Sequence, residues 1–217
     1  MSNYTSPQLV PPPREEEVYP YRPAWRSIAI ETGILLVISG VIWVLYNFVG
    51  FRVPTNLRLP VNVFFALTPT LLWLLFSRLT ENVAPEPRRR LFTTFVVSAL
   101  AANAVGVPLV EGFLQPDRWL AQATAIERII GFATTLAIVQ EFLKFLVLRS
   151  LIWPDFIRVR GDSIAYGAAT AIGYATVLNL HILFATPEIS LDSLALRVLA
   201  YTTVQVAASI IVSYGFS

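Results

Sequence analysis

The sequence contains no cysteine, a single histidine and a single lysine. The absence of cysteine excludes disulfide bonds, thiolate metal sites and a cysteine nucleophile. One histidine without any cysteine is too few for a typical zinc site.

Charged residues are also scarce. They make up 14% of the chain, against about 25% in an average soluble domain, whereas apolar residues make up 55% and the mean hydropathy is +0.63. So few charges cannot cover a surface that faces water on all sides. We therefore expect the lipid bilayer to surround much of the chain, and we expect no nucleic acid among its partners.

Prolines gather at the beginning of the chain. Residues 1–26 contain six prolines and the acidic run Glu15 to Glu17, a composition that favours extended backbone and cannot bury a core. Two interpretations stand side by side: a disordered tail, or an arm that lies on a partner. Because proline restricts the unbound chain and extended segments dock in apolar grooves, we predict a cytoplasmic arm that docks on other membrane protein subunits.

Six apolar runs follow the proline-rich segment, each close to the roughly 20 residues that a helix needs to cross a hydrocarbon core. The first run is longer than the core of a signal peptide, so we expect it to remain as an anchor. Pro69 should kink the second span, and residues 117–128 are typical of a short interfacial helix. The sequence thus predicts an all-α, polytopic bundle of about six transmembrane helices over residues 27–217, with spans at 27–50, 59–77, 91–110, 129–148, 163–185 and 194–217.

The basic residues near the span ends predict the orientation. With the N-terminus inside, ten arginines fall in inside segments and five in outside segments, and Arg88 to Arg90 directly precede the third span. Positive residues are enriched on the cytoplasmic side of membrane proteins. We expect a multi-pass protein of a bacterial cytoplasmic (inner) membrane with a cytoplasmic N-terminus.

Ionisable residues inside the spans are the first candidates for function. Lys144 lies three residues after Glu141 in the fourth span, so the two side chains share a helix face and can pair. The pair is either structural or part of a site. His181 in the fifth span is either a buried, hydrogen-bonded histidine or a ligand.

The fifth span is rich in small residues. Ala165, Ala169 and Gly173 repeat at four-residue spacing, and Gly167 and Ala171 repeat on an adjoining face. Small residues allow close helix packing. The alternative is that they leave room for the backbone of a substrate.

Residues 140–185 resemble the PrsW-type intramembrane protease family. The resemblance rests on Gln140-Glu141-Phe142-Leu143-Lys144, on the stretch from Gly161 to Gly167, and on Gly173-Tyr174-Ala175 followed by Leu178-Asn179. It implies a polytopic, metal-dependent peptidase that works within the membrane. The family's first motif is two glutamates, two residues and a lysine, its second motif ends in Glu-Asn, and a later helix contributes a histidine.

Several of the positions implied by the resemblance hold other residues. The first motif keeps Glu141 and Lys144 but has Gln140 in place of a glutamate. The second keeps Asn179 but has Leu178 in place of a glutamate, and the later histidine falls on Gln205. A metal-activated water needs several anionic or imidazole ligands that converge on one point. We therefore predict no metal, no other cofactor and no catalytic residue.

Two functions remain for the folded chain. The first is a non-catalytic, PrsW-like accessory or structural subunit of a larger membrane protein complex. The second is an active intramembrane metalloprotease with an altered site that uses Glu141, His181 and Asn179.

Overall fold

The computed structural model describes residues 24–80, 87–153 and 160–215, and these residues form helices with no strand among them. Six helical segments of the described residues are long and apolar enough to cross a membrane, which confirms the predicted all-α bundle. Most of the predicted N-terminal arm lies outside the described residues. The elements are α2 (Ala24–Asn47), α3 (Thr55–Thr80), α4 (Pro87–Ala101), the π-helices η1 (Ala102–Gly106) and η2 (Leu109–Leu114), α5 (Pro116–Trp119), α6 (Ala125–Leu151), α7 (Arg160–Ala185) and α8 (Leu191–Tyr214).

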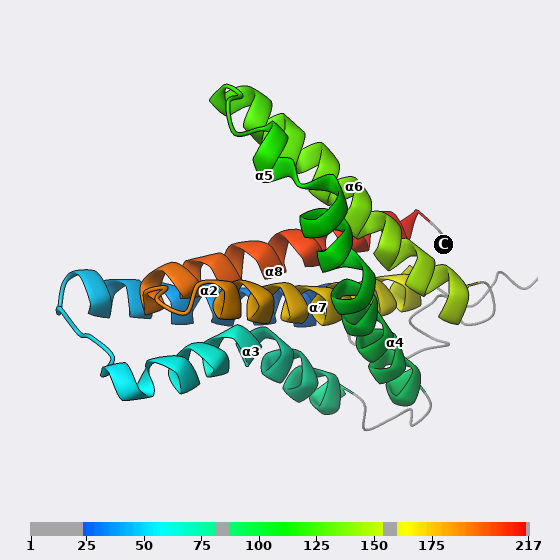
Figure 1. The fold of residues 1–217 in the computed structure, drawn as a ribbon. Helices are drawn as coiled ribbons and strands as arrows, with labels where there is room; N and C mark the ends of the chain where they lie inside the picture. Colours follow the sequence, from blue (N-terminus) through cyan, green and yellow to red (C-terminus); the bar gives the residue numbers. More distant parts are fainter. Residues whose placement is uncertain (1–23, 81–86, 154–159, 216–217) are drawn as a thin grey trace, which may run out of the picture.

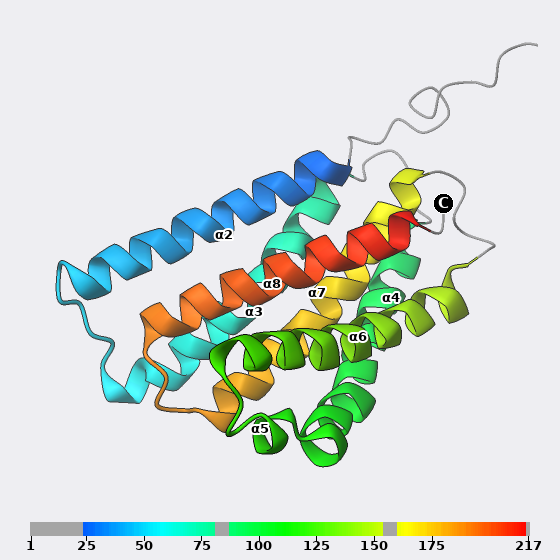
Figure 2. The same ribbon diagram turned by 90° about the horizontal axis from the view of Figure 1, so that it is seen from above.

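Helices α2, α7 and α8 run side by side, with α3 along one edge and α4 crossing them (Figure 1). Helix α6 packs against α4, α7 and α8 along its C-terminal part, and its N-terminal part rises away from the other helices together with α5 (Figure 1). The view from above shows that α2 and α7 begin, and α6 and α8 end, at the same end of the bundle (Figure 2). We refer to this as the α7-start end.

Helix α3 continues across Pro60 and Pro69 as one element and bends near its middle (Figure 1). Proline lacks a backbone N–H and crowds the carbonyl four residues before it, so a bend at Pro69 is expected. The predicted kink is therefore confirmed.

The third span differs from the prediction. It runs from Arg89 to Trp119, beyond the predicted end at residue 110, and includes η1 and η2. Pro108 follows η1, and its missing N–H and bulky ring disturb the regular helical ladder. A π-helical turn accommodates such a disturbance within a continuing helix. Gln115 then ends η2 with a left-handed backbone, at φ 44°, directly before Pro116 and the short helix α5.

The predicted interfacial helix over residues 117–128 is wrong. The short helix α5 ends at Trp119, and residues 125–128 already belong to α6. Helix α6 starts at Ala125 because Thr124 forms a capping box with Glu127. The Thr124 backbone N–H donates to Glu127 Oε2 at 2.8 Å, and the Glu127 N–H donates to Thr124 Oγ1.

Helix α7 is the most buried span, and its small residues explain why. A Cβ atom at Gly173 would lie 2.2 Å from the backbone oxygen of Phe95 on α4, and one at Gly167 would lie 2.3 Å from Ser213 Oγ on α8. Neighbouring helices of the chain therefore fill the space over both glycines. The packing interpretation of these two positions is confirmed.

Candidate functional site

Five polar side chains meet where the C-terminal half of α6 packs against α8. Lys144 lies four residues after Gln140 and three residues after Glu141 on α6, so its side chain is a helix-face neighbour of both. Gln205 and Ser209 lie one turn apart on α8. We call these five residues the polar cluster. Gln140, Lys144, Gln205 and Ser209 are buried, and the Glu141 side chain is 19% exposed.

The polar cluster is joined by a chain of hydrogen bonds. Lys144 Nζ donates both to Glu141 Oε1 and to Gln205 Oε1. The Gln205 side-chain amide in turn donates to Gln140 Oε1, and Ser209 Oγ donates to Glu141 Oε2 at 3.2 Å. The single ammonium therefore lies between the single carboxylate and the amides, and it links α6 to α8.

Tyr174 on α7 forms one wall beside the polar cluster. Its ring centroid is 5.6 Å from Lys144 Nζ, within reach of a cation–π interaction. The tyrosine hydroxyl is buried and has no hydrogen-bond partner among the described residues. It lies against Gly106 of η1, where a Cβ atom would be 2.2 Å from it. The π-helical segment thus brings a residue without a side chain next to this hydroxyl.

Leu178 and Asn179 lie on α7, outside the hydrogen-bonded polar cluster. Asn179 is buried, and its side-chain amide donates to Thr202 Oγ1 on α8 at 3.4 Å. Asn179 Oδ1 is buried without a partner among the described residues. Leu178 is half-buried and offers no polar atom. The structure therefore joins four of the six family positions directly and leaves these two apart.

His181 is bonded to a residue of η2. Its Nε2 atom lies 2.6 Å from Glu111 Oε1, and both side chains are partly exposed. Histidine and glutamate come from elements 70 residues apart in the sequence, and they join α7 to the end of the third span. His181 thus takes part in a helix–helix contact, and its imidazole is engaged by Glu111.

The residues of the polar cluster do not fit a divalent metal ion. Within the described ranges, no three histidine, cysteine, aspartate or glutamate residues come close enough to hold one. Glu141 is the only carboxylate of the polar cluster, and it already accepts hydrogen bonds from Lys144 and Ser209. A buried ammonium at this point would repel a divalent cation, because charges interact strongly where water is excluded.

Three residues of this region were not predicted. Ser209 follows Gln205 by four positions, so helical spacing could have placed both on the face toward α6. Glu111 is an acidic residue within a span, which by itself is a signal of function or pairing. Tyr174 was part of the motif, but no local pattern shows that its side chain reaches Lys144 and Gly106.

Residues 86–217, more than half of the chain, match the profile of the PrsW family intramembrane metalloproteases. The chain belongs to the PrsW family. The match starts just before α4 and continues through α8, so it contains the whole polar cluster and extends well beyond the predicted resemblance over residues 140–185. No curated protein and no solved structure matches the chain. The PrsW family match and the six apolar helices together indicate a multi-pass membrane protein that is similar to intramembrane proteases.

Proposed function

We propose that this PrsW-family chain is a non-catalytic membrane protein that serves as an accessory subunit of a larger membrane protein complex. One observation carries the proposal: Lys144 occupies the centre of the polar cluster and bonds to both Glu141 and Gln205. The side chains that would have to converge on a metal ion or a water molecule bind one another instead.

The chemistry of the polar cluster supports a structural role. Removing either partner from a buried ion pair is strongly destabilising. Lys144 and Glu141 both lie on α6, and their hydrogen bonds with Gln205 and Ser209 join this helix to α8. The amides of Gln140 and Gln205 extend the same contact between α6 and α8. Such a network keeps the bundle packed without any catalytic group.

The test is an assay for peptide-bond hydrolysis on the full chain in liposomes, with a fluorogenic transmembrane peptide and added Zn²⁺. A PrsW-family protease with two glutamates in its first motif serves as the positive control. We expect no cleavage above that of a Glu141→Ala variant. Cleavage that this variant abolishes would overturn the non-catalytic assignment.

The alternative is an active metalloprotease with an altered site, which family membership favours. It would use Glu141, His181 and Asn179. Their contacts in this fold argue against it, because Glu141 bonds to Lys144, His181 to Glu111 and Asn179 to Thr202. If the alternative were correct, His181→Ala and Glu141→Ala would each abolish cleavage in the same assay.

The accessory role rests on the composition of residues 1–26, most of which lie outside the described residues. Apolar and aromatic side chains between six prolines suit docking on an apolar groove, and the glutamates suit a basic patch. We expect a chain in which residues 1–20 are replaced by a glycine–serine segment of equal length to insert normally but to lose copurifying subunits. Unchanged partner stoichiometry would contradict the docking role.

We also propose a bacterial inner-membrane location with the N-terminus in the cytoplasm, on the strength of the arginine distribution. Because the chain has no cysteine, an introduced cysteine is a unique label. In intact cells, a membrane-impermeant maleimide should label a Thr186→Cys variant, which carries the cysteine between α7 and α8, and should leave a Ser2→Cys variant unlabelled. The reverse pattern would invert the orientation.

A further inference from the structure

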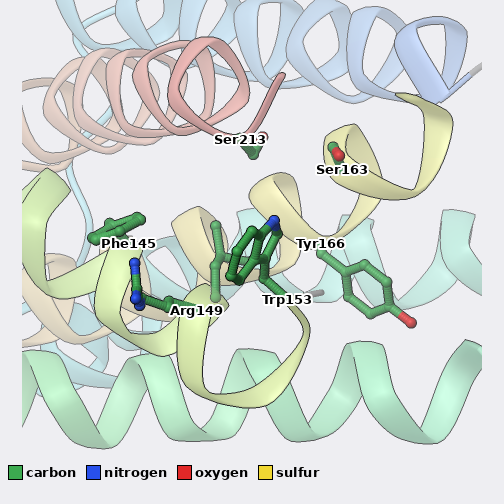
Figure 3. A pocket seen from close by; sticks show the side chains of 7 residues that line it. Phe145, Arg149, Trp153, Ser163, Tyr166 and Ser213 are labelled. Atoms are coloured by element: carbon green, nitrogen blue, oxygen red, sulfur yellow. The ribbon is translucent and has the colours of Figure 1, made fainter. Parts of the chain in front are cut away.

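A pocket opens at the α7-start end of the bundle, where α6 ends, α7 begins and α8 ends (Figure 3). Its volume is about 140 Å³. Aromatic and aliphatic carbon forms most of its lining. Helix α6 contributes Phe145, Leu148 and Arg149, and Trp153 lies two residues after the end of this helix. Ser163 and Tyr166 of α7 and Ser213 of α8 complete the wall. None of these residues belongs to the polar cluster.

Among the described residues that line the pocket, Arg149 carries the one cationic side chain. Its guanidinium lies 5.6 Å from the ring centroid of Trp153 and 6.0 Å from that of Phe145. No carboxylate of the described residues pairs with Arg149. The aromatic rings therefore hold the guanidinium at the pocket, and no carboxylate of residues 24–80, 87–153 or 160–215 occupies its N–H donors.

Ser163 supplies a second, independent indication of a ligand. Its side chain is fully buried, it lines the pocket, and its hydroxyl has no hydrogen-bond partner among the described residues. Ser163 also lies in the first turn of α7, a helix of 26 residues. Backbone N–H groups at the start of a helix attract negative charge. The same pocket is thus lined by a buried hydroxyl near a helix N-terminus and by an arginine that pairs with no carboxylate of the described residues.

The pocket lies near the ends of candidate membrane spans, in a region rich in positive charge. Arg149 is in the last turn of a span, and Trp153 follows it, as is common for tryptophan at the headgroup level. Leu91, next to Arg89 and Arg90, packs against the residues around the pocket, so the basic start of α4 is nearby. Asp162 precedes Ser163 but does not line the pocket.

We propose that this pocket binds the phosphate group of an anionic phospholipid. Arg149 and the hydroxyl of Ser163 contact the phosphate oxygens, and the aromatic lining covers the glycerol side of the headgroup. The volume accommodates a phosphate group, while the acyl chains remain in the bilayer. Basic pockets between transmembrane helices on the cytoplasmic side are typical sites for anionic headgroups. This proposal does not depend on whether the polar cluster is catalytic.

The experiment titrates the purified full chain with phosphatidylglycerol or phosphatidylcholine and counts bound lipid by native mass spectrometry. We expect preferential binding of phosphatidylglycerol, and an Arg149→Gln variant should weaken it about tenfold, the effect of one charge-assisted hydrogen bond. Arg52→Gln is the matched control, because Arg52 also stacks on an aromatic ring, Tyr46 at 3.7 Å, at the other end of α2. The affinity of this control for phosphatidylglycerol should be within about twofold of that of the parent, because Arg52 lies away from the pocket.

Two further variants keep the test decisive if Arg149→Gln does not fold. Arg149→Lys retains the charge and should retain most of the binding, whereas Ser163→Ala should weaken it about threefold through one lost hydrogen bond. Equal binding by the Arg149→Gln and Arg52→Gln variants, or equal binding of the two lipids, would overturn the proposal. Displacement of phosphatidylglycerol by inorganic phosphate at millimolar concentration would instead assign the pocket to free phosphate and overturn the lipid assignment.

Discussion

Replacing Lys144 with methionine separates the ion pair of the polar cluster from simple packing. Methionine fills a similar volume but removes the ammonium, so Glu141 is left as a largely buried carboxylate. Removing one partner of a fully buried pair costs about 3–5 kcal/mol. The Glu141 side chain is 19% exposed and keeps the hydrogen bond from Ser209, which lowers the cost. We therefore expect the free energy of unfolding to fall by about 2 kcal/mol for Lys144→Met, below the fully buried limit.

Removing the carboxylate of the pair should lower the free energy of unfolding more than removing the ammonium does. Glu141→Leu leaves the ammonium of Lys144 with only Gln205 as a hydrogen-bond acceptor, and the Lys144 side chain is 1% exposed. We expect the free energy of unfolding to fall by about 3–4 kcal/mol for Glu141→Leu, because the remaining ammonium is almost completely buried. The double variant carries neither charge, so it should be more stable than the sum of the single changes predicts.

The free energy of unfolding is measured for the parent, the two single variants and the double variant by titration with sodium dodecyl sulfate in mixed micelles. The exposed pair Arg58–Glu188 is the control cycle, since its side chains are 31% and 89% exposed, and its coupling should be below about 1 kcal/mol. If Lys144→Met unfolds at the same denaturant fraction as the parent, or if the changes in the double variant are additive, the ion pair of Lys144 with Glu141 does not stabilise the packed bundle.

Three further predictions concern packing, helix capping and metal. Gly173→Ala should lower the free energy of unfolding by about 1–3 kcal/mol because the new Cβ would meet the backbone of Phe95. The control Gly33→Ala should be neutral or stabilising, because a Cβ at Gly33 would have nothing within 4 Å. Equal effects of the two variants on thermal unfolding would refute the close approach of α7 to α4. Thr124→Ala should lower the free energy of unfolding by about 1 kcal/mol, because the capping box with Glu127 is lost. An unchanged unfolding midpoint would show that the cap does not contribute to stability. Elemental analysis of the purified chain should find far less than one transition-metal ion per molecule, and a stoichiometric metal would contradict the conclusion that the polar cluster does not fit one.

The sequence by itself determined the six spans and the fold class. The length of each apolar run can be read along the chain and compared with the thickness of a bilayer, without any knowledge of how the helices pack. It also determined the bend at Pro69 and the shared face of Glu141 and Lys144, which follow from chemistry within one or two helical turns. Family membership could likewise be inferred from the short motifs between Gln140 and Asn179.

Only the tertiary structure decided which polar groups meet. Gln205 lies 61 residues after Lys144, and Glu111 lies 70 residues before His181, so both contacts depend on how whole helices pack. The end of the third span escaped prediction for a related reason. A π-helical turn before Pro108 lets the helix continue to Gln115 where the apolar pattern suggested an earlier stop. The pocket at the α7-start end needs three helices at once, and no single segment of the sequence indicates it. Gly167 and Gly173 let α7 approach α8 and α4 closely, and that approach is a property of the packed bundle.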